Sequence, residues 1–177
     1  MYCELMEPVS LGHYLAHEAG RLAGVDGDRI GQWARWGHIR ASVSAGDPHV
    51  YSFADVADAL AVHLLLEAGI ALPVIRRAVE RLGGLRDGLH VVDGVLAVES
   101  GDGLKDVFTE QRVLPLNGRI DAAALLRRGG WPTLKTGVEV DVDPARAGGH
   151  PCVKGTRRPV QDALEDPDIA RWWACGG

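Results

Sequence analysis

The sequence predicts a mainly α protein with a small β element, and three observations support this prediction. Apolar residues recur at helical spacing across residues 10–83, where Gly, Pro and Asp mark the ends of several short segments. At residues 89–98 two β-rich runs flank an Asp-Gly pair, which is a strong hairpin signal. Hydrophobic residues make up 46% and charged residues 24% of the 177 residues, a composition that can bury a core.

The first two predicted helices form a closely joined pair. Residues 17–23 fit a short helix that Gly24 can end, and Asp28 can cap the start of a second helix. On the second helix Ile30 and Trp33 fall three residues apart, on the face that would turn inward. Two short helices joined by a tight turn predict a helix-turn-helix unit.

The outward face of that second helix is basic. Arg29, Gln32 and Arg35 point away from the apolar face, and residues 29–44 hold three arginines and no acid, a local charge of +3. The whole chain carries a net charge of −5, so only a local patch could attract nucleic acid. Chance clustering in an acidic protein is the alternative explanation.

A small wing is predicted after the helix pair. Residues 38–50 are polar and rich in turn formers, and residues 45–48 fit the tip of a loop between two extended pieces. Ser52 and Asp55 then have the spacing of an N-terminal capping box, and the helix that follows should end at Gly69.

Pro73 suits the first turn of one more helix, which should end before Gly83 and Gly84. The side chains predicted to face inward are Ile75, Val79 and Leu82. Those predicted to face outward are Arg76, Arg77 and Glu80. Residues 10–83 are therefore predicted to form one winged helix-turn-helix domain.

The hydrophobic period changes after this domain. We expect residues 84–137 to be a hairpin-containing region that connects and dimerises the protein. Its hairpin strands are predicted at 89–92 and 95–98, with a further strand within 107–114 and a short helix or turn at 121–128.

The remaining residues, 138–177, begin with an alternating strand at 138–142. Residues 145–161 are rich in glycine and contain four Lys or Arg residues and no acid, a local charge of +4. The tail that follows is acidic and then aromatic.

The sequence motifs of common enzyme classes are missing. No phosphate-binding glycine loop, dinucleotide fingerprint, nucleophile elbow or HExxH motif occurs. His13 and His17 stand four residues apart, but no further ligand with matching spacing completes a metal site, and two ordinary histidines are the simpler interpretation. We therefore expect neither catalysis nor a cofactor.

The cysteines and the hydrophobic pattern indicate the compartment. Cys3, Cys152 and Cys175 are odd in number and lack the spacing of a metal or disulfide framework, so we expect reduced thiols and no structural metal. No apolar run reaches the roughly 18 residues of a membrane span, and the start of the sequence lacks the pattern of a signal peptide. We expect a cytoplasmic protein without a membrane partner.

Four segments in order, residues 14–26, 30–39, 51–56 and 67–77, resemble the winged helix-turn-helix domain of MerR-type transcription regulators. The resemblance implies DNA binding, with the second helix in the major groove and the wing and a later helix near flanking phosphates. The residues assigned to DNA on this basis and from the free helix face are Arg29, Gln32, Arg35, Trp36, Arg40, His49 and Tyr51.

The sequence also departs from that family. Gly31 and His49 stand where MerR-type proteins commonly carry arginines that touch the DNA backbone. The long C-terminal dimerisation helix of the family is missing, because Gly83 ends the last helix early. A metal- or drug-sensing regulator of the usual design is therefore not expected.

Residues 143–160 are similar to a second pattern, D-P-x(4)-G-x-P-x-[IV]-x-G-T-R-x-P-[VT], of a small antitoxin-like domain that here looks truncated. Together the two resemblances point to VapB-type antitoxins of type II toxin–antitoxin systems. They imply a protein that represses its own operon and neutralises a PIN-like ribonuclease toxin. The residues assigned to the toxin are Lys154, Arg157, Arg158, Trp172 and Trp173.

Several alternatives stay open at this point. The glycine-rich stretch could be a purely structural loop, and the tryptophans could close the protein's own core. The expected partners are operator DNA, the cognate toxin and a second copy of the chain, with the dimer contact within residues 85–160. The competing functions are a MerR-like transcription regulator without a toxin and an interaction module without DNA activity.

Overall fold

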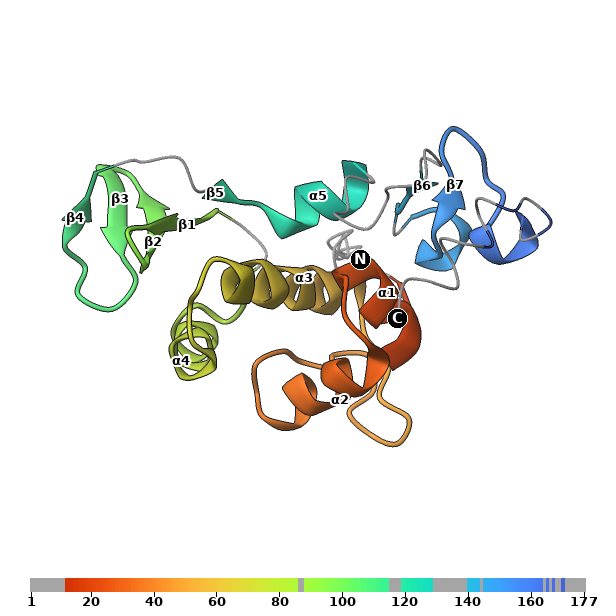
Figure 1. Cartoon of the computed structure of the whole chain (residues 1–177), viewed down its shortest axis with the longest axis horizontal. Coiled ribbons are helices and arrows are strands. Elements are labelled where there is room, and N and C mark those ends of the chain that lie inside the picture. Colours follow the sequence, from red (N-terminus) through yellow and green to blue (C-terminus); the bar gives the residue numbers. More distant parts are fainter. Residues whose placement is uncertain are drawn as a thin grey trace, which may run out of the picture.

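The computed structural model places four helices, a sheet and a small hairpin around a long central helix (Figure 1). The residues that the structure describes are 12–85, 88–114, 119–128, 140–143, 145–163, 165, 167 and 170. Within them the predicted fold class is confirmed, because a helical helix-turn-helix region with a wing precedes a hairpin-containing sheet.

The first two helices are α1 (Ala16–Ala23) and α2 (Gly27–Arg35). Gly24 ends α1 in the left-handed conformation, at φ 75°, as the sequence predicts. The turn is tight because Gly20 packs directly beneath it, where a Cβ atom would lie 2.6 Å from the Val25 carbonyl oxygen.

The cap of α2 is Asp26, two residues before the predicted one. Its carboxylate accepts a hydrogen bond of 2.7 Å from the backbone N–H of Arg29. Asp26 has the extended backbone of a capping residue, whereas Asp28 already lies inside the helix and is exposed. The prediction that Asp28 caps this helix is therefore wrong.

The central helix is α3 (Phe53–Glu67), and α4 (Leu72–Leu82) follows it. Ser52 and Asp55 form the predicted capping box of α3, and most residues of α3 are buried, as expected for a helix with neighbours on several sides. Pro73 lies in the first turn of α4 and Gly83 directly follows its last residue, as predicted, but Leu82 is 37% exposed, so its predicted inward orientation is wrong.

A five-stranded antiparallel sheet follows, in the order β4-β3-β2-β1-β5. Its strands are β1 (Leu89–Val92), β2 (Val95–Ser100), β3 (Gly103–Asp106), β4 (Arg112–Val113) and β5 (Arg119–Ile120). The predicted hairpin is confirmed, because Asp93 and Gly94 both have positive φ values, which suit a two-residue turn between β1 and β2.

The strand predicted within residues 107–114 is mostly a turn. The Asp106 carboxylate accepts hydrogen bonds from the backbone N–H groups of Phe108 (2.6 Å) and Thr109 (2.8 Å). These bonds fold the chain back before it reaches β4, so within the predicted range the strand itself is limited to Arg112–Val113, although the Val107 N–H still donates to the Leu96 carbonyl oxygen over 2.8 Å.

One face of the sheet and the predicted short helix complete the main core. The helix is α5 (Ala122–Arg128), and it packs along α3 (Figure 1). Buried Leu89 and Leu96 belong to the same hydrophobic cluster as the helices. Val92, Ala97 and Leu104 form a second, small cluster on the opposite face of the sheet.

The C-terminal elements are β6 (Val140–Asp141), η2 (Ala147–Gly149), β7 (Cys152–Val153) and η3 (Val160–Ala163). β6 and β7 pair antiparallel, which confirms the described part of the predicted strand; positions 138 and 139 lie outside the described residues. Buried Val142 and Val160 join the main cluster, so the core continues across the predicted boundaries at 83/84 and 137/138.

Candidate nucleic-acid interface

The outer face of α2 carries three long polar side chains. Arg29, Gln32 and Arg35 are all exposed, whereas Ile30 and Trp33 on the inner face are 0% and 2% exposed. The buried pair fixes the rotation of the helix about its axis. The three polar residues of the predicted site therefore lie together and face outward.

The end of α2 is held against α4 by a buried histidine. His38 is 5% exposed, and burial lowers the pKa of its imidazole, with the nearby Arg76 charge lowering it further. A hydrogen bond with the backbone of Leu72, the first residue of α4, opposes part of that shift. The net lowering of the pKa favours the neutral imidazole, and the hydrogen bond connects the end of α2 to α4. Trp36, at the C-cap, is 53% exposed with its ring 6.4 Å from the His38 ring.

The wing is a short two-stranded ribbon beside α2. Ser44 and Val50 exchange backbone hydrogen bonds of 3.1 and 2.9 Å, and the exposed Asp47 lies at the tip. One leg of the wing is anchored at Ser42, whose N–H and hydroxyl donate to the buried Asp55 carboxylate over 2.8 and 2.6 Å. The predicted site residue Arg40 is exposed on the chain that leads to this leg.

The other leg of the wing is anchored at Tyr51. Its backbone exchanges two hydrogen bonds of 2.9 Å with the backbone of Tyr14, just before α1. The Tyr51 side chain is fully buried, and burial raises the pKa of its phenol. Tyr51 therefore belongs to the support of the wing, whereas the sequence assigns it to the DNA surface. His49 is half-buried and its ring lies nearly parallel to that of Tyr51.

A hollow of about 360 Å³ separates α2 from the wing. The charged and ionisable residues that line it are His17, Asp28, Arg35, Asp47 and His49. Sequence reasoning missed Asp28 and Asp47 as members of this surface, because their closeness to Arg35 depends on how the wing folds over α2.

Arg76 is a further cation near this surface that sequence reasoning did not assign to DNA. It is exposed in the first half of α4, pairs with Glu80 over 3.1 Å, and its charge reaches His38 at the end of α2. Arg76 lies four residues after Leu72, where α4 begins, and on the face predicted to point outward. That position is the sequence signal that could have identified it.

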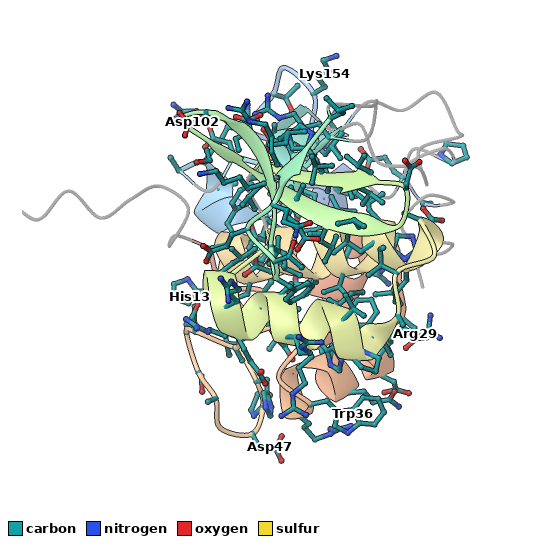
Figure 2. The ribbon with its side chains drawn as sticks, turned by 90° about the vertical axis from the view of Figure 1, so that its left-hand side faces the viewer. His13, Arg29, Trp36, Asp47, Asp102 and Lys154 are labelled. Carbon is teal, nitrogen blue, oxygen red and sulfur yellow. The ribbon has the colours of Figure 1, made fainter. Side chains whose placement is uncertain are left out.

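The residues assigned to a toxin lie away from α2. Figure 2 shows Trp36 and Asp47 at one end of the molecule and Lys154 at the other. Lys154 and Arg157 are exposed, whereas Arg158 pairs with Glu165 and donates two hydrogen bonds to the Asp162 carbonyl oxygen. Trp172 and Trp173 lie outside the described residues.

Comparisons with known proteins agree with this geometry. Residues 14–82 match the family described as MerR HTH family regulatory protein. The X-ray crystal structure of Rv2018 from Mycobacterium tuberculosis is similar to this chain, with a TM-score of 0.53, 17% sequence identity, and coverage of 95% of this chain and 92% of that one. No curated protein matches the chain significantly.

These findings assign the first part of the chain. Residues 14–82 form a MerR-type helix-turn-helix domain, a DNA-binding regulatory module. The likeness to Rv2018 extends along nearly the whole chain and concerns the fold alone. Among the described residues no cluster of three His, Cys, Asp or Glu suits a metal ion, and none of the helices there has the length and apolar character to cross a bilayer.

Proposed function

We propose that this protein is a DNA-binding transcription regulator that represses its own operon. The observation that carries the proposal is that Arg29, Gln32 and Arg35 are exposed together on one face of α2. The opposite face of the helix is buried in the core, which sets its orientation. An α-helix fits the major groove, and arginine and glutamine side chains can pair with base edges and phosphates there. The wing and Arg76 then lie beside the helix, where flanking phosphates would pass.

The test is a binding titration with the full chain. A fluorescent duplex that covers the promoter of the protein's own operon should bind more tightly than a shuffled duplex of equal length. The logarithm of the affinity should fall linearly with the logarithm of salt concentration, with a slope of about −0.9 for each phosphate contact. Equal binding to both duplexes would contradict a sequence-specific regulator.

The same proposal includes a homodimer, because two half-sites on DNA call for two recognition helices. Leu104 of the small apolar cluster, Val113 packed against it, and Leu114 at 79% exposure line a hollow of about 500 Å³. Acidic Glu99 and Asp102 and basic Arg112 also line it, a mixture of charges that suits a twofold contact of the surface with itself.

Sedimentation velocity on the full chain tests this contact. A dimer that Leu114→Asp converts to monomer, while Leu82→Asp on α4 does not, would support it. A chain that ends at Leu82 is a poorer test, because it would expose the side of α3 that α5 covers.

An antitoxin role is the second candidate function. What supports it is the D-P…G-T-R pattern of residues 143–160 and the exposure of Lys154 and Arg157. Lys154 lies at the end of the molecule away from Trp36 (Figure 2). A chain arranged in this way could hold DNA at one end and an acidic partner at the other. Guanidinium groups pair bidentately with carboxylates, which is the chemistry needed to enter the acidic metal site of a PIN-like nuclease.

A further inference from the structure

A loop near the C-terminus covers Tyr14, which lies two residues before the start of α1. We name residues 145–151 the glycine loop. Tyr14 is fully buried, and its hydroxyl donates a hydrogen bond to the carbonyl oxygen of Gly149 in this loop. Burial, followed by the Glu18 carboxylate, raises the pKa of Tyr14, so the hydroxyl keeps the proton that it donates. His150 Nδ1 also lies 3.6 Å from Glu18 Oε1 of α1.

The fit between this loop and Tyr14 leaves no room for a further atom. Gly149 has φ +85°, and a Cβ atom there would meet the Tyr14 hydroxyl and lie 3.0 Å from the Gly12 Cα atom. A Cβ atom at Gly12 would lie 2.6 Å from Cε2 of the same ring. The tyrosine is therefore seated between two glycines that are far apart in sequence.

Tyr14 also supports the wing. Its backbone makes the two 2.9 Å hydrogen bonds with Tyr51, and Tyr51 directly follows Val50, which pairs with Ser44 inside the wing. A continuous path of three contacts thus runs from Gly149 through Tyr14 and Tyr51 to the wing strands. Figure 1 shows the chain around β6 and β7 beside α1, on the side of the molecule where this path begins.

We propose that the glycine loop controls the wing. When the loop is seated on Tyr14, the wing is held in the position that fits DNA; when the loop is displaced, the wing loosens and DNA affinity falls. The DNA half of this proposal rests on the proposed function, whereas the coupling between loop and wing is a property of the free protein. A partner with an acidic surface that grips Lys154 and Arg157, just beyond the loop, has the chemistry to displace it.

The first experiment compares two glycine variants of the full chain by amide hydrogen exchange. Gly149→Ala and Gly155→Ala both place a side chain at a left-handed position, φ +85° and φ +76°, but a Cβ atom at Gly155 meets nothing within 4 Å. Backbone strain is thus matched, and only Gly149→Ala disturbs Tyr14. We expect the Ser44 and Val50 amides to exchange at least about fivefold faster in Gly149→Ala, the lower end of ordinary coupling, and to stay unchanged in Gly155→Ala.

Two further variants make the result decisive. Tyr14→Phe removes only the hydroxyl and should shift the wing amides in the same direction by a smaller factor. Asp55→Ala removes the carboxylate that accepts the hydrogen bonds from Ser42, and it shows how fast the wing amides exchange when the wing is loosened from α3. If the His150 amide exchanges faster in Gly149→Ala while the wing amides match those of the wild type, the coupling is overturned.

The second experiment measures binding to the duplex of the protein's own promoter. Gly149→Ala should lower the affinity about fivefold or more, and Gly155→Ala less than about twofold. Equal affinity of Gly149→Ala and wild type, in the presence of a loosened wing, would overturn the link to DNA. A wild-type chain that binds no duplex overturns that link together with the proposed function, while the exchange comparison still decides the coupling.

Discussion

Alternating side chains of α2 have opposite surroundings. Ile30 and Trp33 are buried and set the orientation of the helix, and Arg29 and Arg35 on either side of them in the sequence are left exposed. Of the three outward polar residues of α2, Arg35 also lines the hollow beside the wing. It therefore belongs both to the exposed helix face and to the surface next to the wing.

We predict that Arg35→Ala weakens binding to the operator without unfolding the protein. Loss of a base contact would cost about 1–3 kcal/mol of binding free energy, and loss of a phosphate contact would make the salt slope shallower by about 0.9. Arg157→Ala, which removes an exposed arginine of the loop after β7, is the matched control and should bind as the wild type does. Unchanged affinity and slope in folded Arg35→Ala would mean that this helix face does not contact DNA.

His38 gives the stability of the domain a pH dependence with a defined sign. Its pKa is lowered in the folded protein, so below the unfolded value of about 6.5 the unfolded chain binds a proton that the folded chain does not. The contribution of the neutral imidazole is fully present above that pH and is lost as the pH falls. The melting temperature should therefore drop less between about pH 7.5 and pH 5.5 in His38→Gln than in the wild type.

The control for this prediction is His13→Gln, which alters an exposed histidine. It should show the wild-type drop in melting temperature. An identical drop in His38→Gln would mean that the buried imidazole does not link the fold to pH.

Local sequence signals predicted single residues well where the interaction spans a few positions. The Ser52–Asp55 capping box and the glycine ends of α1 and α4 were predictable because the partners lie within one helical turn. The burial of Tyr51 was not, since it depends on Tyr14, which is 37 positions earlier in the chain. Its assignment to DNA followed a family resemblance rather than its surroundings.

At the scale of elements, the wing is a ribbon fixed at both legs to buried residues. Asp55 accepts hydrogen bonds from Ser42 and from the Ser52 N–H, so one carboxylate both caps α3 and anchors the wing. A capping box alone would leave the wing free of the helix, and it is the bond to Ser42 that joins the two elements.

We predict that Asp55→Ala lowers the free energy of unfolding by about 3 kcal/mol, because it leaves buried donors without an acceptor. Urea denaturation of the full chain measures this loss. Asp47→Ala, at the exposed wing tip, should stay within about 0.5 kcal/mol of the wild type. A loss of that small size in Asp55→Ala would show that water replaces the carboxylate and that the wing is anchored elsewhere.

Elements were predictable to the extent that their signals are local. The β1–β2 hairpin followed from the Asp93-Gly94 pair, whereas the strand predicted at 107–114 was replaced by a turn because Asp106 bonds the backbone ahead of it. The pairing of β5 with the far edge of β1 joins residues about 30 positions apart, and nothing in either segment alone specifies it.

At the scale of the whole molecule, three sequence regions share one hydrophobic cluster. Residues of α3, of the inner sheet face and of the C-terminal elements all belong to it. The glycine-rich stretch near the C-terminus was predictable as a special segment from its composition, but its seat on Tyr14 was not, because the two are 135 residues apart in the chain. The candidate DNA surface and the basic loop at Lys154 lie at opposite ends (Figure 2).

Because the two surfaces are separate, one substitution should abolish neutralisation of a toxin and leave operator binding unchanged. Arg157 is exposed in the loop after β7, whereas Arg158 is engaged with Glu165 in the same chain, so Arg157→Glu is the cleaner reversal of charge. A glutamate facing the acidic site of a nuclease would be repelled, and like charges across an interface cost several kcal/mol. Under the antitoxin role proposed as the second candidate function, we therefore expect Arg157→Glu to lose rescue of cells from a cognate PIN-like toxin, and to lose that toxin in pull-downs.

The same variant should bind operator DNA as the wild type does, because a single exposed substitution seldom changes stability by more than about 0.5 kcal/mol and the nearby Lys154 lies at the other end of the molecule from Trp36 (Figure 2). Arg81→Glu, which reverses an exposed charge near the end of α4, is the control for the change of net charge and should keep rescue. Full rescue by Arg157→Glu at normal expression would contradict the antitoxin role. Parallel loss of rescue and of DNA binding would instead mean that the substitution disturbs the glycine loop and, through Tyr14, the wing.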